Sequence, residues 1–280
     1  MRRLLVFLLA AKIAVFASLA GADTGDDELL KFVRVLHQGK VHHGILSLGQ
    51  VRFLDRSFLD PEASFTGKIV ALEELQLLTP VAPKKVIGVA LNYASHGGTP
   101  GSDIGLFSKL PSSLIAHEET IVPPPGTTGV HYEGEMVLVI AHKTKGVSEE
   151  KAKDNIFGVT VGNDVTDRAI GTSGFSIIRG KGSDTFGPMG PWIVRGLDYD
   201  NLALSTLVNG ETVQKTRTSK AINNAARIVS YISQYITLER GDVIFTGTSG
   251  TTRAMQPGDV VEVKLEGVGT LRNTVGKAPD

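Results

Sequence analysis

Residues 131–140 read HYEGEMVLVI, and this stretch decides the fold class. Its apolar second half, rich in β-branched residues, predicts a buried strand. Strand side chains alternate, so we expect Glu133 and Glu135 on one face and Tyr132, Gly134 and Met136 on the other. Two carboxylates ~4 Å apart repel by about 4 kcal/mol at an effective dielectric of 20, and desolvation adds several kcal/mol per ion. A bound cation reverses both terms; a solvated acidic strand end is the alternative.

A second apolar run spans residues 156–161 and leads into Asp164. A carboxylate at the mouth of a core strand can complete an all-oxygen site with Glu133 and Glu135. Three carboxylates without a thiol or a committed histidine favour Mg²⁺ or Mn²⁺, with Ca²⁺ as a third candidate, over zinc. Arg168 follows closely and is a candidate clamp or partner for a carboxylate.

Composition narrows the class of protein. The chain has 280 residues, enough for one large domain or a main domain with a small appendage. Apolar residues make up 41% and the formal net charge is zero, which favours a sizeable core and argues against nucleic acid as a partner. The absence of cysteine excludes disulfides, thiolate catalysis and zinc–sulfur sites.

The first 22 residues differ from the rest of the chain. Arg2 and Arg3 precede apolar runs at 4–11 and 13–19, and a small-x-small triplet at 20–22 comes before a polar segment. This pattern predicts a secretory signal peptide, residues 1–22, and therefore a secreted or periplasmic protein. Lys12 interrupts the apolar region, so a signal anchor and a misassigned start codon stay open as alternatives. No later segment approaches the ~20 apolar residues that span a bilayer.

Residues 23–80 are predicted to form a small N-terminal β-rich domain that is followed by a catalytic domain over residues 81–280. Apolar segments at 31–36 and 44–48 flank a polar turn, and Thr79, Pro80 and Pro83 mark the junction. The neighbouring pair His42 and His43 suggests a metal site, but adjacent strand residues point to opposite faces, so we interpret both as ordinary, half-exposed histidines.

Strands dominate the larger domain. Apolar runs at 86–91, 136–141 and 156–161 predict strands, as do the runs 243–245 and 260–263, which each follow a Gly-Asp pair. Asn209-Gly210 predicts a two-residue hairpin. Apolar residues recur at helical spacing over 221–234, and Ser148 before two glutamates marks a second helix start. The sequence predicts a mixed α/β, strand-rich fold with few helices.

Short motifs occur in a fixed order along residues 80–275. The motifs are Asn92-Tyr93-x-x-His96, Phe107-x-Lys109, Tyr132-Glu133-x-Glu135, Asn163-Asp164-Val165-x-x-Arg168, Gly180-Lys181-x-x-Asp184-Thr185-Phe186-x-Pro188-x-Gly190-Pro191-Trp192, Val208-Asn209-Gly210-Glu211-x-x-Gln214, Gly241-Asp242-Val243-Ile244-x-Thr246-Gly247-Thr248 and Pro257-Gly258-Asp259-Val260-Val261. In order and spacing they resemble the fumarylacetoacetate hydrolase superfamily. The region before Pro80 resembles the short N-terminal domain that many members carry.

The resemblance implies a β-roll fold, a homodimer, and a magnesium or manganese site. Glu133, Glu135 and Asp164 match the metal ligands of the family. The remaining matches concern the substrate. Lys181 corresponds to a lysine that contacts a substrate oxygen, and Thr248 corresponds to a threonine that contacts the substrate carboxylate. His96 corresponds to a histidine that activates water, and Tyr93 and Arg168 correspond to further substrate-binding positions. Packing roles remain the alternative for Lys181, Thr248 and His96.

The chemistry that the resemblance implies is cleavage of a carbon–carbon bond in a β-diketo acid or acylpyruvate through a metal-stabilised enolate. In this reaction His96 takes a proton from water. The sequence departs from the family at three places: Thr99 replaces a glutamate that supports the histidine, residues 170–172 lack a glutamine, and Ser249 replaces a proline. Another carboxylate, Asp103 or Asp167, is then a candidate partner for His96.

Two alternatives to the hydrolase stay open. A decarboxylase, tautomerase or isomerase of keto acids needs the same enolate but no activated water, and the missing glutamate favours it. A non-catalytic protein that binds a metal–carboxylate complex belongs to a different class. Metal-dependent turnover of acylpyruvates with product identification separates the three.

Overall fold

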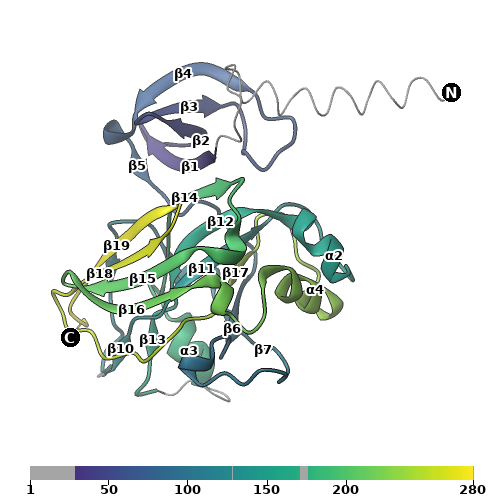
Figure 1. Cartoon of the computed structure of the whole chain (residues 1–280). Helices are drawn as coiled ribbons and strands as arrows, with labels where there is room; N and C mark the ends of the chain where they lie inside the picture. Colours follow the sequence, from purple (N-terminus) through teal and green to yellow (C-terminus); the bar gives the residue numbers. More distant parts are fainter. Residues whose placement is uncertain (1–28, 128, 171–175, 280) are drawn as a thin grey trace.

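The computed structural model describes residues 29–127, 129–170 and 176–279 (Figure 1). The predicted signal peptide lies outside these residues. No helix in the described part of the chain is long and apolar enough to cross a bilayer.

The N-terminal region is an antiparallel sheet, shown in purple and blue in Figure 1. Its strands are β1 (Leu30–His37), β2 (Lys40–Ser47), β3 (Gln50–Leu54), β4 (Phe65–Ala71) and the short β5 (Gln76–Leu77), which pairs with β1. The two-residue turns Gln38-Gly39 and Leu48-Gly49 have positive φ at both positions, the backbone that tight hairpins require. The β-rich interpretation of this region is confirmed.

The N-terminal strands are continuous with the main sheet. β1 pairs with β14 (Gly187–Arg195), so that Leu30 lies opposite Arg195 and Phe32 opposite Ile193. The sheet continues through β12 (Ile156–Asn163), β11 (Gly134–Ile140), β17 (Val243–Phe245), β6 (Val86–Ala90) and β7 (Gly105–Lys109), while β8 (Leu114–Ile115) pairs with β14. One sheet therefore spans both regions.

A second sheet packs on the first. Its order is β16 (Glu211–Arg217), β15 (Ala203–Val208), β18 (Val260–Leu265), β19 (Gly269–Val275) and β9 (Thr120–Ile121); β10 (Val130–His131) and β13 (Thr166–Asp167) form a separate pair. Met136 and Val161 of the first sheet share a buried core with Leu204 and Val263 of the second. The turn at Asn209-Gly210 joins β15 to β16, which confirms the predicted hairpin.

Helices are few and short among the described residues. They are α2 (Glu149–Ala152), α3 (Ile177–Gly182), α4 (Ala225–Tyr235) and the 3-10 turns η1 (Leu72–Glu74), η2 (Ala94–His96), η3 (Pro111–Ser113), η4 (Lys153–Asn155), η6 (Tyr199–Asn201) and η7 (Thr218–Lys220). The strand-rich α/β prediction is confirmed.

The predicted start of α4 at residue 221 is wrong by four residues. Asn224 caps the helix, because its side chain accepts a hydrogen bond from the Arg227 N–H. The preceding residues are used elsewhere: Ala221 bridges to Tyr93, and the Ile222 N–H donates to the Asn92 carbonyl. Backbone groups committed to another segment are not available for the first helical turn.

Candidate active site

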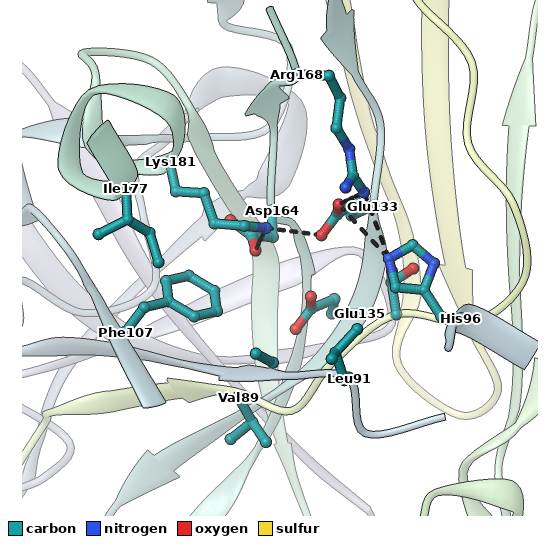
Figure 2. Close-up of a pocket in the computed structure, with 12 residues that line it drawn as sticks. Val89, Leu91, His96, Phe107, Glu133, Glu135, Asp164, Arg168, Ile177 and Lys181 are labelled. Carbon is teal, nitrogen blue, oxygen red and sulfur yellow. Dashed lines mark hydrogen bonds and ion pairs between the residues drawn. The ribbon is translucent and has the colours of Figure 1, made fainter. Parts of the chain in front are cut away.

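A cavity of about 280 Å³ opens among the ends of β6, β7, β11 and β12 and the helix α3 (Figure 2). This volume suits a small molecule. The lining residues are Val89, Ala90, Leu91, His96, Phe107, Glu133, Glu135, Asp164, Arg168, Ile177, Lys181 and Thr248. Of the predicted site residues, Tyr93 is the one that does not line this cavity.

Three buried carboxylates meet at the base of the cavity. Glu133, Glu135 and Asp164 each offer an oxygen, and these atoms lie within 4.8 Å of one another. Glu133 directly precedes β11, and Asp164 directly follows β12, its neighbour in the sheet. The Asp164 N–H donates to the Glu133 carbonyl at 2.8 Å, and the Glu133 N–H donates to Asn163 Oδ1 at 2.8 Å. Paired strand ends therefore fix the spacing of the cluster.

Gly134 separates the two glutamates for a steric reason. A Cβ at this position would clash with Thr206, which lies on β15 of the second sheet. The small residue lets the sheets approach closely here, while the glutamate side chains turn toward the cavity.

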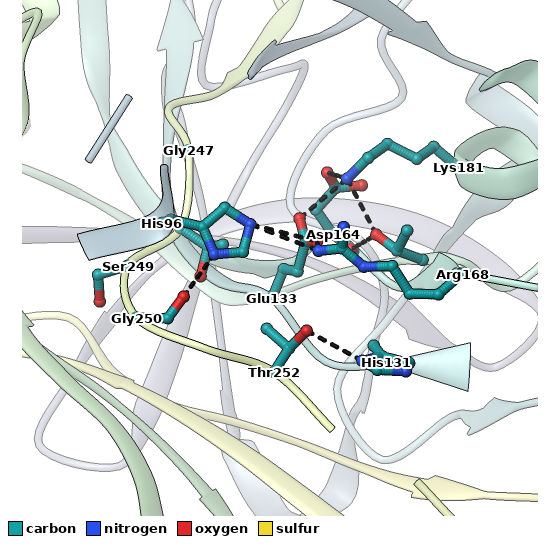
Figure 3. A network of polar contacts seen from close by, with 12 residues as sticks. His96, His131, Glu133, Asp164, Arg168, Lys181, Gly247, Ser249, Gly250 and Thr252 are labelled. Carbon is teal, nitrogen blue, oxygen red and sulfur yellow. Dashed lines mark hydrogen bonds and ion pairs between the residues drawn. The ribbon is translucent and has the colours of Figure 1, made fainter. Parts of the chain in front are cut away.

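Two of the carboxylates bind cationic side chains. Glu133 accepts from Arg168 at 2.5 Å and from Lys181 Nζ at 2.9 Å (Figure 3). Asp164 accepts from Lys181 Nζ at 2.5 Å and from Lys109 Nζ at 2.5 Å. Burial works to raise the pKa of Asp164, but the two ammonium groups outweigh it and hold this pKa below its usual value. Burial likewise opposes the charge of Lys181, yet Asp164 and Glu133 raise its pKa.

Glu135 has no cation in contact. Its side chain is 1% exposed and accepts one hydrogen bond among the described residues, from the Gly247 N–H to Oε2 at 2.7 Å. Burial, reinforced by the charges of Asp164 and Glu133, raises the pKa of Glu135 well above the usual value. Lys181 offsets only part of this effect, so the ionised form of Glu135 needs a further positive partner, which the described side chains do not supply by contact.

Lys109 is a site residue whose role was not predicted. The side chain is fully buried on β7, and Nζ donates to Asp164 and to the Lys181 carbonyl oxygen. Burial lowers its pKa, an effect that Asp164 opposes. The available signal was the spacing of Phe107 and Lys109, which are two residues apart on a strand and therefore share one of its faces.

His96 is held in one orientation by the backbone. Its Nδ1 lies 2.5 Å from the Gly250 carbonyl oxygen (Figure 3). Because a carbonyl only accepts, Nδ1 carries the proton in the neutral ring and Nε2 presents its lone pair. Nε2 lies 3.4 Å from an Arg168 nitrogen and 3.9 Å from Glu133 Oε1, on the cavity side.

The hypothesis that Asp103 or Asp167 supports His96 is wrong. The carboxylate of Asp167 instead accepts hydrogen bonds from the Thr127 hydroxyl and from the Ala169 and Ile170 N–H groups. These bonds stabilise the turn that follows Asp167. Neither aspartate is among the contacts of the imidazole. A main-chain carbonyl from the late loop takes the orienting role.

Thr248 is fixed from two sides. Its hydroxyl donates to the Gly134 carbonyl at 3.0 Å and accepts from Gln214 Nε2 at 2.9 Å. Gln214 also bonds the Ser249 carbonyl and, through Oε1, the Gly134 N–H. This glutamine, quoted as part of a motif but given no role, therefore holds the late loop against β11.

Tyr93 has a packing environment. Its side chain is buried beside Met136 and Ile228, and burial raises the pKa of its hydroxyl. The neighbouring Asn92 bonds the backbone of Thr246 and Asn223 and thereby ties the end of β6 to the end of β17. The geometry gives this pair a supporting role and does not favour Tyr93 as a substrate-binding residue.

The donor set fits a divalent cation of the oxygen-binding kind. Three carboxylates converge, none of the described residues nearby offers a sulfur ligand, and Glu135 lacks a counter-charge. Hard cations such as Mg²⁺, Mn²⁺ and Ca²⁺ prefer this chemistry. Glu133, Glu135 and Asp164 are the residues that would hold it.

Two family models together match most of the chain. The model described as fumarylacetoacetate (FAA) hydrolase C-terminal matches residues 85–276, and the model described as Rv2993c-like, N-terminal matches residues 30–80. The chain belongs to the fumarylacetoacetate hydrolase superfamily. The resemblance read from the ordered motifs is thus confirmed, and with it the fold class.

Individual relatives agree with this assignment. The protein Rv2993c of Mycobacterium tuberculosis is 42% identical over 219 residues, which cover 76% of this chain and 83% of that protein. A mitochondrial oxaloacetate tautomerase of Bos taurus is 32% identical over 74% of this chain and 71% of its own length. The crystal structure of a 2-hydroxyhepta-2,4-diene-1,7-dioate isomerase from Mycobacterium marinum superposes with a TM-score of 0.84 at 35% identity, covering 90% of this chain and all of that one.

The superfamily includes several reaction types. A bifunctional isomerase/decarboxylase of Salmonella dublin is 36% identical over 68% of this chain and 46% of its own length. A maleylpyruvate hydrolase from Sphingobium, at 24% identity and a TM-score of 0.75, shares the fold. Family membership therefore establishes the scaffold and leaves the reaction to the site.

Proposed function

We propose that this protein is a divalent-metal-dependent enzyme that moves a proton at the carbon next to the keto group of a small 2-keto acid, as a tautomerase or isomerase. The observation that carries the proposal is the position of His96 Nε2. It lies at the cavity wall, 3.9 Å from a carboxylate of the acidic cluster, with its ring oriented by the Gly250 carbonyl.

The cluster Glu133, Glu135 and Asp164 would hold the cation, which when bound supplies Lewis-acid polarisation of the keto oxygen. Lys181 Nζ donates to Glu133, Asp164 and Thr166 Oγ1, and its positive charge would stabilise developing negative charge on a substrate oxygen beside them. Thr248 lines the same cavity, and its hydroxyl would have to turn away from the Gly134 carbonyl to donate to the carboxylate end of a keto acid.

His96 acts as the base. The Nε2 lone pair takes a proton from C3, the C–H electron pair forms the C2–C3 double bond, and the carbonyl π electrons move to oxygen. The same nitrogen returns the proton to oxygen or to another carbon, which completes an enol or an isomer. Proton transfer of this kind contributes about 10²–10⁴-fold.

The names of the relatives, and not the surroundings of His96, favour proton transfer over carbon–carbon hydrolysis. Both reactions turn the ring into an imidazolium, which a carboxylate on its far nitrogen would stabilise. In this chain the far nitrogen meets a neutral carbonyl, and Arg168 lies 3.4 Å from the near one. The relatives above 30% identity whose names state a reaction include a tautomerase and an isomerase. Hydrolysis of an acylpyruvate is the second candidate.

Deuterium exchange tests the proposal. The protein is incubated with 2-oxobutyrate in D₂O with Mg²⁺, and proton loss at C3 is followed by NMR, with a chelator-treated sample as control. Metal-dependent exchange without fragmentation supports proton transfer. Cleavage of acetylpyruvate into two acids without such exchange would instead assign the hydrolase, and tight oxalate binding with neither reaction would assign a binding protein.

A further inference from the structure

The cavity has two walls of different chemistry. The carboxylates, Arg168, Lys181 and His96 gather on one side, and four apolar side chains gather on the other (Figure 2). The apolar wall consists of Val89, Leu91, Phe107 and Ile177. A ligand whose head is bound by the cluster has to place its remaining atoms against this wall.

The apolar wall is held in position by packing. Phe107 on β7 lies directly opposite Gly88 on β6, and any side chain at Gly88 would clash with the ring. The face of the ring also lies 4.8 Å from Lys181 Nζ. Ile177 precedes Lys181 by four residues on α3, so the two side chains share one face of the helix and both line the cavity.

Leu91 is an exposed leucine with a left-handed backbone, as is Leu48 of the N-terminal hairpin, but Leu91 lines the cavity. It is 56% exposed although it lines the cavity, and its φ of +53° lies in the left-handed region that leucine rarely adopts. Its position at the mouth of the cavity favours contact with an apolar part of the ligand.

The cations that line the described part of the cavity are already paired. Arg168 and Lys181 both bind Glu133, and Lys181 Nζ, which lies 4.8 Å from the centre of the Phe107 ring, also binds Asp164. A second carboxylate on the ligand would therefore lose water at this wall without gaining a counter-charge.

We propose that the site selects 2-keto acids with a hydrocarbon tail and discriminates against 2-keto dicarboxylates, with Leu91, Phe107 and Ile177 as the specificity-determining residues. This inference rests on the keto-acid function proposed above. The head, a carboxylate with an adjacent keto oxygen, is common to both ligand classes, so discrimination comes from the tail alone.

Titration calorimetry at constant Mg²⁺ tests the inference with two tails of similar shape. The isopropyl group of 5-methyl-2-oxohexanoate replaces the distal carboxylate of 2-oxoglutarate. Oxalate, which has no tail, measures binding of the head group alone. We expect the isopropyl acid to bind at least about tenfold more tightly than 2-oxoglutarate, and each methylene from pyruvate to 2-oxohexanoate to tighten binding about fourfold. Equal or tighter binding of 2-oxoglutarate, with oxalate bound, overturns the selectivity and leaves the keto-acid function standing. If oxalate and all the keto acids fail to bind, both are overturned.

Two pairs of variants locate the selectivity. Ile177→Arg puts a guanidinium into the wall and should tighten 2-oxoglutarate at least about tenfold, whereas Ile178→Arg, at the adjacent and 46% exposed position, should leave wild-type affinities. Leu91→Asn keeps a residue that tolerates positive φ and should weaken the isopropyl acid about tenfold. Its control is Leu48→Asn, an exposed leucine with φ +49° in the N-terminal hairpin.

Folding of each variant is checked by circular dichroism. If Ile177→Arg is unfolded, the comparison of Leu91→Asn with its control Leu48→Asn tests the role of the wall. An unchanged ratio of the two affinities in the folded Ile177→Arg or Leu91→Asn variant refutes the assignment of the wall.

Discussion

Replacing Glu135 by glutamine should stabilise the metal-free protein while it removes the metal. The carboxylate is buried, and its one hydrogen bond comes from the Gly247 N–H, which an amide oxygen also accepts. The cluster oxygens lie within 4.8 Å, so at an effective dielectric of 20 each of its two repulsions is about 3 kcal/mol. The positive charge of Lys181 offsets part of this repulsion.

The net gain from Glu135→Gln is therefore roughly 2–4 kcal/mol in the free energy of unfolding without metal at pH 8. For a chain of this size that corresponds to a rise in Tm of about 3–7 °C. The same substitution removes a charged metal ligand, so we expect the affinity for Mn²⁺ to fall at least ~100-fold.

Differential scanning calorimetry in chelator and Mn²⁺ titration followed by electron paramagnetic resonance measure the two effects. Glu211→Gln is the control: this glutamate is exposed and pairs with Arg253, so its removal should change little. A Tm in chelator at or below that of the unmodified protein would refute the electrostatic reasoning. Stoichiometric Mn²⁺ at the original affinity would refute the ligand assignment.

Three further changes probe other parts of the molecule. His96→Ala should slow proton exchange at least ~100-fold while oxalate and Mn²⁺ still bind, because the ring serves as the base and not as a ligand; an unchanged exchange rate removes it from the mechanism. Lys109→Met should destabilise the protein by about 3 kcal/mol in urea unfolding, since it leaves Asp164 with one cation fewer in a buried setting, and a neutral result would show that Lys181 suffices. Burial, with a smaller effect of Arg34, lowers the pKa of His43 from 6.5 to about 4, so that on acidification His43 is protonated in the unfolded chain before it is protonated in the folded one. The free energy of unfolding is therefore at its full value above pH 6.5 and falls by about 3 kcal/mol as the pH drops to 4. His43→Leu should flatten this pH dependence, as measured by urea titrations.

The sequence predicted the centre of the site because strand alternation and strand ends are local properties. Glu133 and Glu135 flank one glycine, and Asp164 ends the next apolar run, so period-two spacing and sheet pairing were enough to expect convergence. The hairpin at Asn209-Gly210 followed from turn chemistry in the same way.

What the sequence did not predict depends on contacts between distant segments. The orienting partner of His96 is a backbone carbonyl 154 residues away, which leaves no signal in side-chain identity. The start of α4 shifted because Asn92 and Tyr93 bind the residues before it. Lys109 looked like an ordinary strand lysine until Asp164 was placed beside it. Export and homodimeric assembly stay predictions.

The pairing of β1 with β14 means that the two family segments are not separable modules. Strand β14 contacts β12 on one edge and offers Ile193–Arg195 to β1 on the other, so the first hairpin covers polar backbone that would otherwise face water. A truncated chain that begins at Pro80 would expose the backbone N–H and C=O groups of Ile193–Arg195, where a strand of another molecule could pair and cause aggregation. Recombining this catalytic region with a foreign N-terminal part therefore requires a replacement strand at that edge.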